Sequence, residues 1–393
     1  MGAIGTSALA AHQIALQTAA VMFMVPFGIS LAATVRVGHA VGRGDAPATR
    51  RAGFVALGLG SLIGRVYVYA PRAVLTETPD EIWNKDGSAP GDRFGFSLAR
   101  GDIRQSDPNR LDLVVGAPFA TSSIRFIASA GEVTAFEGAN LNGPVLAFLA
   151  GTYSGTGFGS ACAFIRRFAP NPEVISDDLA IGMPAADLPA PLGSEMTCGS
   201  GAVFVYDGES PGPSTEPFGR LRYSISALRS NEQFGQAIAS VANLAVIDGN
   251  DDYLVVGAPA STVPGLPQSG VIRLYDRTTG AFLLERSPYD DEPALDHSGS
   301  RYGASIARLG EFILDAPTGE EIAVGAPGES GSTGKVYIYT VASGPTLVFR
   351  FSILGKAPAD QFGFSVGEVR VDMARVMARK DGIVQHSRQG LGE

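Results

Sequence analysis

The chain has 393 residues, a formal net charge of −9 and only two cysteines. This length suits two or three domains, the acidic balance argues against nucleic acid as a partner, and two cysteines cannot form a disulfide framework. The 50 glycines and 25 prolines lie among many Val, Ile, Leu and Phe residues. This composition indicates a turn-rich β protein and excludes a disordered low-complexity chain.

Charge is distributed unevenly along the chain. Residues 1–62 carry about +3 and residues 371–393 about +1, so the intervening part carries about −13. We therefore divide the chain into three segments, 1–62, 63–370 and 371–393.

Residues 14–35 form an apolar stretch without a charged side chain. About 20 such residues are enough to span a bilayer as a helix, so we predict membrane contact through this stretch. The basic residues follow the stretch, unlike those of a signal peptide, and place the next loop in the cytoplasm. They are Arg36, Arg43, Arg50 and Arg51.

The sequence "GTSALAAHQIALQTAAVMFMVPFGISLAATVRVGHAVGRGD" resembles the multidrug and toxin extrusion (MATE) transporters, near the start of their second half. The resemblance covers residues 1 to about 62. It implies an origin in a helical antiporter that exchanges a drug for H⁺ or Na⁺. Such transport needs two halves that rock around a midplane site, and 1–62 supplies one predicted span and part of another.

Internal repeats dominate the middle segment. A Phe-Gly or Tyr-Gly pair begins at Phe94, Phe158, Phe234, Tyr302 and Phe362, and the first four pairs are followed by Gly-Ala-Pro or Gly-Met-Pro. Each repeat then continues with an alternating strand such as "GEVTAF" or "GKVYIY" and a weaker fourth strand. The apolar run "LDLVVGAP" is typical of a strand buried on both faces and ended by proline.

Four short strands per repeat, stacked radially, predict a β-propeller. The two motifs resemble FG-GAP repeats, the repeats of the integrin α-subunit propeller, over about 65–369. The predicted fold is all-β: an incomplete FG-GAP propeller with four full blades, at 94–152, 158–228, 234–290 and 302–355. The pieces "GRVYVYAPRAVL", "EIWNKDG" and "FGFSVGEV" make a partial blade that lacks its second strand. The N-terminal membrane helix and a short C-terminal helix complete the prediction.

The resemblance also implies a calcium loop before Gly-Ala-Pro, where carboxylates at alternating positions converge on the ion. The first copy has Asp102, Asp107, Asn109 and Asp112, and the third has Asp248, Asn250 and Asp252, with Tyr253 in place of the last acid. The second and fourth copies are irregular. Two interpretations stay open: solvated turn carboxylates, or weak calcium sites in the first and third loops.

Residues 371–393 have helical apolar spacing. They resemble a stretch of the pyridine-nucleotide disulfide oxidoreductases, but that family's FAD loop and redox cysteine pair are missing, so no redox activity is expected. Within the repeats, His297 lies in the polar loop "DHSGSRYG" and is expected to be solvated. Cys162 and Cys198 fall in one repeat and would pair only if the protein were exported.

These observations predict a non-enzymatic propeller for adhesion or protein binding, truncated and exposed outside the cell, with an unknown protein ligand at its loops. The alternative is a membrane multidrug antiporter fragment. A third candidate, an enzyme with a propeller module, lacks a segment for a catalytic domain. Each resemblance starts or stops inside a structural unit without a linker, which leads to the hypothesis of a chimeric reading frame.

Overall fold

We describe the protein from a computed structural model. The described residues are 64–69, 81–89, 91–103, 111–122, 126–138, 140–165, 177–186, 199–208, 221–241, 253–263, 266–310, 319–342, 344–357 and 361–364. The predicted membrane stretch 14–35 and the predicted helix 371–393 lie outside them. In the part described, no helix is long and apolar enough to cross a membrane.

The chain divides into two compact units, Met1–Phe94 and Gly95–Glu393. The described part of the first unit holds a two-stranded antiparallel sheet of β1 (Arg65–Tyr69) and β2 (Glu81–Asp86). Val66 and Trp83 supply its buried side chains. The alternating β-branched and aromatic residues of β1 favour an extended strand.

The described part of the second unit contains four antiparallel sheets of four strands each, and the strands of each sheet are hydrogen-bonded in chain order. The first sheet is β3 (Ser97–Gly101), β4 (Asp112–Ala117), β5 (Glu132–Phe136) and β6 (Ala147–Ala150). The second is β7 (Ala161–Ile165), β8 (Asp178–Met183), β9 (Ala202–Tyr206) and β10 (Leu221–Ser226). The third is β11 (Ala237–Val241), β12 (Tyr253–Ala258), β13 (Val271–Asp276) and β14 (Phe282–Arg286).

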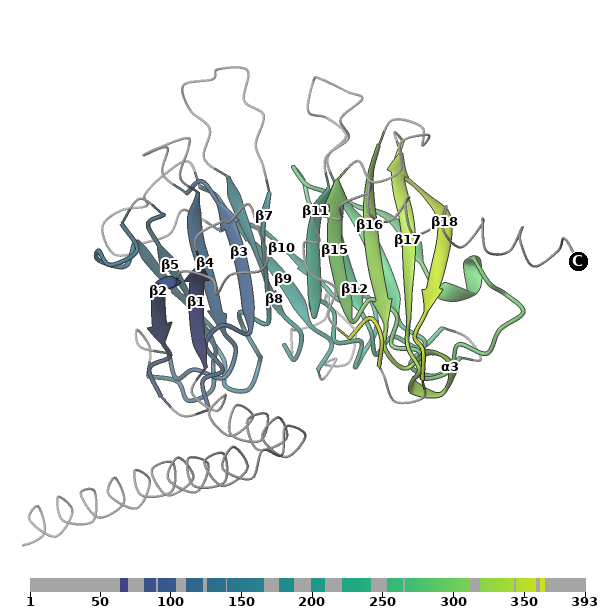
Figure 1. Ribbon diagram of the computed structural model, residues 1–393, viewed down its shortest axis with the longest axis horizontal. Helices are drawn as coiled ribbons and strands as arrows, with labels where there is room; N and C mark the ends of the chain where they lie inside the picture. Colours follow the sequence, from purple (N-terminus) through teal and green to yellow (C-terminus); the bar gives the residue numbers. More distant parts are fainter. Residues whose placement is uncertain are drawn as a thin grey trace, which may run out of the picture. The chain divides into compact units, whose positions relative to one another are not determined.

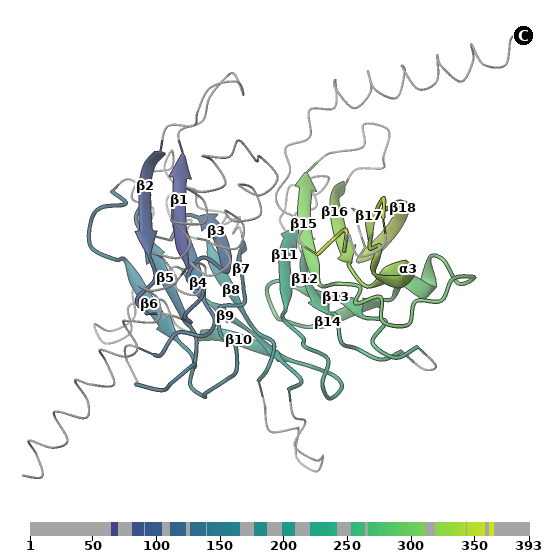
Figure 2. The same cartoon turned by 60° about the horizontal axis from the view of Figure 1, so that its bottom comes forward.

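The fourth sheet is β15 (Ser305–Gly310), β16 (Gly319–Ala326), β17 (Lys335–Ala342) and β18 (Thr346–Leu354). A 3-10 turn, η1 (Pro288–Asp290), lies before the sheet in the chain. The short segment α3 (Glu329–Ser332) lies between β16 and β17 and is labelled in Figure 1. The strands of this sheet are also labelled in the turned view of Figure 2.

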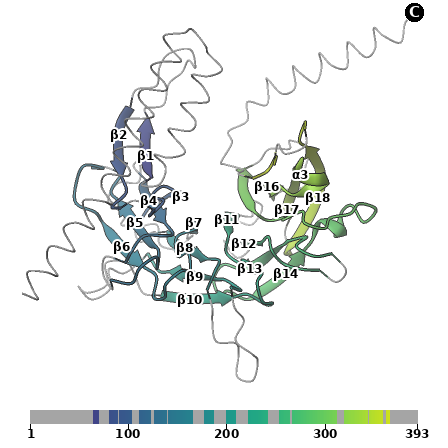
Figure 3. The same ribbon diagram turned by 90° about the horizontal axis from the view of Figure 1, so that it is seen from below.

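The apolar second strand of each repeat lies inside its sheet. Every residue of β8 and of β12 is buried, as expected for a strand with a neighbour on both edges and packing on both faces. In Figure 3 the second sheet runs in order from β7 to β10 and the third from β11 to β14. The first strands make most of the contacts between sheets: β3 packs on β7, β7 on β11, and β11 on β15, with smaller contributions from the second strands.

Neighbouring sheets meet through glycine. A Cβ on Gly257 of β12 would lie 2.0 Å from the carbonyl oxygen of Gly303, the glycine of the next Tyr-Gly pair. Gly116, Gly182 and Gly325 meet the following repeat's glycine in the same way, at 2.1, 2.0 and 1.9 Å. Gly303 itself has φ of +85°, a conformation that L side chains rarely adopt. The paired motifs therefore form one contact, in which backbone packs directly on backbone.

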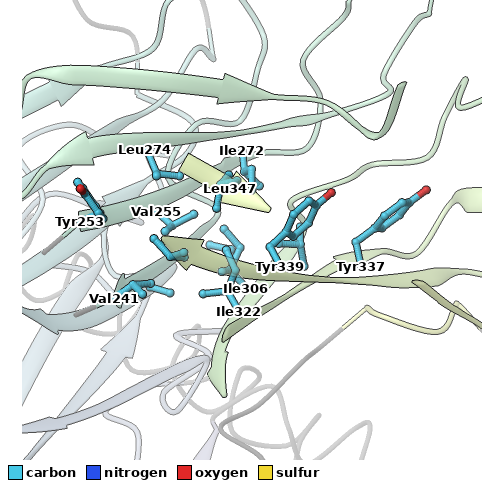
Figure 4. Close-up of a cluster of buried hydrophobic side chains, with 14 of the residues drawn as sticks. Val241, Tyr253, Val255, Ile272, Leu274, Ile306, Ile322, Tyr337, Tyr339 and Leu347 are labelled. Atoms are coloured by element: carbon cyan, nitrogen blue, oxygen red, sulfur yellow. The ribbon is translucent and has the colours of Figure 1, made fainter. Parts of the chain in front are cut away.

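Apolar clusters fill the space between sheets. The largest joins the third and fourth sheets and includes Val255, Ile272, Leu274, Ile306 and Tyr339 (Figure 4). A second cluster joins the second and third sheets, and a third joins the first and second. Successive sheets thus bury the faces that they turn toward each other, because a single four-stranded sheet cannot cover itself.

Candidate functional site

The carboxylates predicted as calcium ligands are only partly within the described residues. Asp102 and Asp112 are described, whereas Asp107, Asn109, Asp248, Asn250 and Asp252 lie outside, so the structure does not test the two loops as sites. In the described part of the chain, no group of three or more His, Cys, Asp or Glu side chains is placed to hold a metal ion.

Asp112 opens β4 and is buried. One carboxylate oxygen accepts the backbone N–H of Ile103 and the other accepts that of Gly138, both at 3.0 Å. Burial raises the pKa of Asp112, although these two donors act in the opposite direction. Asp112 therefore ties the ends of β3 and β5 to the sheet.

The second and fourth repeats also have a buried acid at this position, and the third has the buried Tyr253. Asp178 of β8 accepts the N–H of Gly208 at 3.3 Å and pairs with Arg222 at 2.5 Å. Glu321 of β16 accepts the hydroxyl of Thr340 at 3.0 Å. An acid just before the apolar run thus serves as a hydrogen-bond acceptor within its own sheet. From the sequence alone, this recurring acid suggests a metal ligand. In the structure, its carboxylate oxygens accept hydrogen bonds from the protein itself.

His297 is fully buried, so the expectation that it is solvated is wrong. Its Nδ1 lies 2.9 Å from Oε1 of Glu329, and its Nε2 lies 2.9 Å from the carbonyl oxygen of Glu292. A carbonyl oxygen only accepts, so Nε2 carries a proton, and a second proton must lie between Nδ1 and the carboxyl group. The pair accordingly holds one proton more than a neutral imidazole beside a carboxylate.

Three effects act on the protonation of His297. Burial disfavours the charged ring, but the hydrogen bonds to Glu329 and Glu292 outweigh it and raise the pKa of His297. The carboxylate of Glu292 is neutralised separately by Lys335, whose Nζ lies 2.6 Å away. The other oxygen of Glu329 has no hydrogen-bond partner in the described part of the chain.

Two tyrosine hydroxyl groups form a hydrogen-bonded chain that ends at Asp291, the residue before Glu292. Tyr302 donates to the hydroxyl of Tyr339 at 2.8 Å, and Tyr339 donates to Asp291 at 2.6 Å. Arg286 pairs with the same carboxylate. Burial raises the pKa of both tyrosines well above its usual value, so they remain neutral donors at physiological pH.

A second buried polar group lies at the third sheet. Arg273 of β13 is fully buried and makes a two-point contact with Glu232, at 2.6 and 2.7 Å. Its Nε also bonds Glu285 of β14 at 2.7 Å, and Arg229 pairs with Glu285 at 2.8 Å from the exposed side. Burial would lower the pKa of Arg273, but the two carboxylates raise it. Every charge here has a partner, which is typical of a structural network.

Cys162 is a buried free thiol, and Ser97 donates a hydrogen bond to its sulfur at 3.4 Å. Burial raises the pKa of this thiol to about 12, which makes it unreactive. Cys198, its predicted partner under export, lies outside the described residues.

Comparison with known proteins gives matches at the N-terminus. The MatE family model matches residues 1–71. A 54-residue stretch is 82% identical to a probable multidrug resistance protein NorM of Rhodopseudomonas palustris and covers 14% of this chain and 11% of that protein. A 60-residue stretch is 72% identical to its counterpart in Bradyrhizobium diazoefficiens (15% and 13%). A 79-residue stretch is 57% identical to the multidrug resistance protein NorM of Burkholderia vietnamiensis (19% and 17%).

These matches correct the functional prediction. They contradict the interpretation of the chain as an integrin-like adhesion or protein-binding protein and favour the alternative, multidrug efflux. They confirm the MATE resemblance of the N-terminal segment and lend no support to the FG-GAP and oxidoreductase resemblances. The MatE match also runs to residue 71, across β1, although the sequence predicted a boundary at 62.

Proposed function

We propose that this chain takes part in multidrug efflux through an N-terminal segment of MATE type that inserts into the membrane. The observation that carries the proposal is the MatE match over residues 1–71, together with 82% identity to a NorM protein over 54 residues. The chain spans between 11% and 17% of the length of the three relatives named above. The activity of a complete transporter is therefore part of the proposal.

Residues 14–35 are the physical basis for membrane insertion. They offer an uncharged apolar stretch of spanning length, and the arginines that follow it favour a cytoplasmic position for the next loop. The predicted location of the β-rich part outside the cell has no support from the matched proteins, and we do not propose it.

The first experiment tests membrane insertion with the full chain. We would express it in a bacterium that lacks its main efflux pumps and extract the membranes with alkaline carbonate, which removes peripheral proteins. The chain should stay in the membrane pellet. The double variant Val21→Asp/Val25→Asp should leave the pellet, because each central charge costs about 2.5–3.5 kcal/mol. The matched control, Val21→Leu/Val25→Leu, should behave as the original chain.

The second experiment tests efflux in the same cells. Accumulation of a fluorescent lipophilic cation should fall when the chain is expressed and should recover in the Val21→Asp/Val25→Asp variant. A chain that stays in the carbonate pellet but leaves dye accumulation unchanged would refute the efflux proposal while leaving the membrane proposal intact.

We also propose that the four sheets of the second unit are successive blades of a β-propeller. Two observations support this: the chain-ordered strands of each sheet, and the repeated contacts among β3, β7, β11 and β15. A cross-linking series with cysteine pairs placed on neighbouring first strands would test it, since blades of a ring should link only to adjacent blades.

A further inference from the structure

The buried pair of His297 and Glu329 joins two loops at one end of the fourth sheet. His297 precedes β15, and Glu329 begins α3, which links β16 to β17. Nδ1 of His297 lies 2.9 Å from Oε1 of Glu329, and neither side chain is more than 1% exposed. A backbone hydrogen bond from Gly328 to the carbonyl oxygen of Ser300, at 2.9 Å, joins the same two loops. The pair therefore ties α3 to the loop before β15 in the interior of the protein.

The α3 segment has a strained backbone. Ser330, Gly331 and Ser332 have φ of +52°, +68° and +68°, so three consecutive residues have a positive φ. L side chains rarely adopt this conformation, and such a run persists only when its surroundings hold it in place. Glu329 is the residue that enters this run, and its carboxylate is held by His297.

The strained segment carries the attachment of the next repeat. Gln361 donates its backbone N–H to the carbonyl oxygen of Ser332 at 3.1 Å. Phe362 donates its own to the carbonyl oxygen of Thr333, also at 3.1 Å. A Cβ on Gly334 would lie 2.2 Å from the carbonyl oxygen of Phe362, so the two backbones are in direct contact. A movement of α3 is therefore transmitted to Phe362.

The same backbone connection occurs in all four repeats, but only the fourth makes it with an ionisable residue. The residue two positions after the proline of Gly-Ala-Pro or Gly-Met-Pro accepts the N–H of the glycine that precedes the third strand, and that glycine meets the next Phe or Tyr. In the fourth repeat, Glu329 accepts from Gly334 at 3.0 Å. The equivalent residues, which are also buried, are Ala120, Ala186 and Ser261.

The extra proton of the pair allows His297 to make both of its hydrogen bonds. A neutral ring has one N–H, so either Nε2 would face the carbonyl oxygen of Glu292 without a proton, or Nδ1 would face the carboxylate of Glu329 without one. Loss of the proton therefore turns one of the two contacts into a repulsion beside a buried carboxylate. Burial disfavours the charged ring, but the two hydrogen bonds raise the pKa of His297 above its usual value of about 6.5.

The other titratable groups that face the pair do not supply this change of charge. Asp296 is exposed, and hydrogen bonds from Ser298 lower its pKa. Burial would raise the pKa of Glu292, but the hydrogen bond from Lys335 lowers it, so Glu292 stays ionised. Burial raises the pKa of Tyr337, which stays neutral. These groups come from three elements: Glu292 and Asp296 from the loop of His297, Glu329 from α3, and Lys335 and Tyr337 from β17.

We propose that the His297–Glu329 pair is a pH-sensitive switch: while it holds its extra proton it keeps α3 in place, and loss of the proton releases α3 and Phe362 from the fourth sheet. The attachment is present at low pH and is lost as pH rises through the folded-state pKa of His297. The opening is local, because strands β15 to β18 keep their own hydrogen bonds. The inference concerns the second unit only, and it stands whether or not the N-terminal segment takes part in efflux.

Hydrogen exchange of the full chain in mild detergent tests the switch. Exchange is followed by mass spectrometry between pH 6 and pH 9 and is corrected for its intrinsic pH dependence. We expect the peptide that contains Gln361 and Phe362 to lose at least about tenfold in protection over this range. The internal reference is Phe234, which donates the equivalent bond to Ser200 at 2.9 Å in a junction without an ionisable residue at the position of Glu329. Its protection should change much less, and equal changes at the two places, or none at Phe362, would overturn the proposal.

Two variants assign the response to the pair. His297→Gln replaces the titrating ring by a neutral amide that can donate to Glu329, so the protection of Phe362 should no longer depend on pH. Asp296→Asn changes the exposed acid next to His297 and is the matched control, which should keep the pH response. Circular dichroism establishes that both variants are folded. A pH response that persists in folded His297→Gln would overturn the proposal, and if this variant does not fold, the pH series of the original chain decides alone.

Discussion

The proton held between His297 and Glu329 gives stability a specific pH dependence. The pKa of His297 is raised in the folded protein, so protonated His297 stabilises the fold. This contribution to the free energy of unfolding is fully present below the unfolded-state pKa of about 6.5 and is lost as pH rises through the folded-state pKa. Glu329→Gln should therefore destabilise the fold by about 1–3 kcal/mol at pH 6 and by much less at pH 9. Urea unfolding of the original protein and of the Glu329→Gln variant at each pH measures the difference in their free energies of unfolding. An equal cost at both pH values would show that the pair carries no extra proton.

The network around Arg273 allows a buried partner, Glu232, to be compared with an exposed member, Arg229. Glu232→Gln leaves the fully buried guanidinium of Arg273 without its main counter-charge, and we expect a loss of about 3–5 kcal/mol. Arg229→Met removes an exposed partner of Glu285 and should cost less than about 1 kcal/mol. Chemical denaturation of the two variants tests the ranking, and similar losses would contradict it.

Asp112 allows the two interpretations of the acidic loops to be separated. Asp112→Asn places an amide N–H against a backbone N–H donor, which should cost about 1–3 kcal/mol. If the residue serves the sheet alone, the loss is the same with calcium and with a chelator. A loss that appears only in calcium would make Asp112 a metal ligand. The thermal midpoint, measured in both conditions, decides between the two.

At the scale of an element, the second strand depends on its glycine. Gly257→Val suits a strand by local propensity, but its Cβ would lie 2.0 Å from the Gly303 carbonyl oxygen, so the third and fourth sheets must separate. We expect a loss of roughly 3 kcal/mol or more. Gly344→Asn is the control: it has φ of +73° and open space around it, and should cost about 0.5 kcal/mol. Thermal unfolding compares the two, and equal losses would argue against the close approach.

Much at this scale could be predicted from the sequence. The apolar run that ends at Gly116-Ala117-Pro118 corresponds to β4, and "GKVYIY" corresponds to β17, because local alternation and proline determine strands directly. The environment of His297 could not be predicted in this way. Its partner Glu329 lies 32 residues later, and its other partner is a backbone carbonyl, which leaves no mark in the sequence. Asp112 was identified as important, but only the structure shows that its partners are backbone N–H groups.

At the scale of the whole molecule, the N-terminal segment and the β-rich unit differ in kind. The MatE match ends at residue 71, whereas the MATE resemblance implies helices and residues 65–69 form a strand. We hypothesise that the chain has a chimeric origin. This hypothesis predicts that no natural transcript joins the two parts. Amplification of RNA from the source with primers in 1–62 and in 95–393 tests it. A continuous transcript across residues 62–71 would contradict the hypothesis.

The glycine contact between sheets also has a genetic consequence. It is made by backbone atoms that are the same at Gly116, Gly182, Gly257 and Gly325. A gene that gains or loses one complete repeat therefore encodes a protein in which every remaining glycine contact between sheets keeps its chemistry. Unequal crossing-over within such a gene would change the number of sheets without disturbing this backbone contact, so variation in repeat number is a form of divergence that this architecture tolerates.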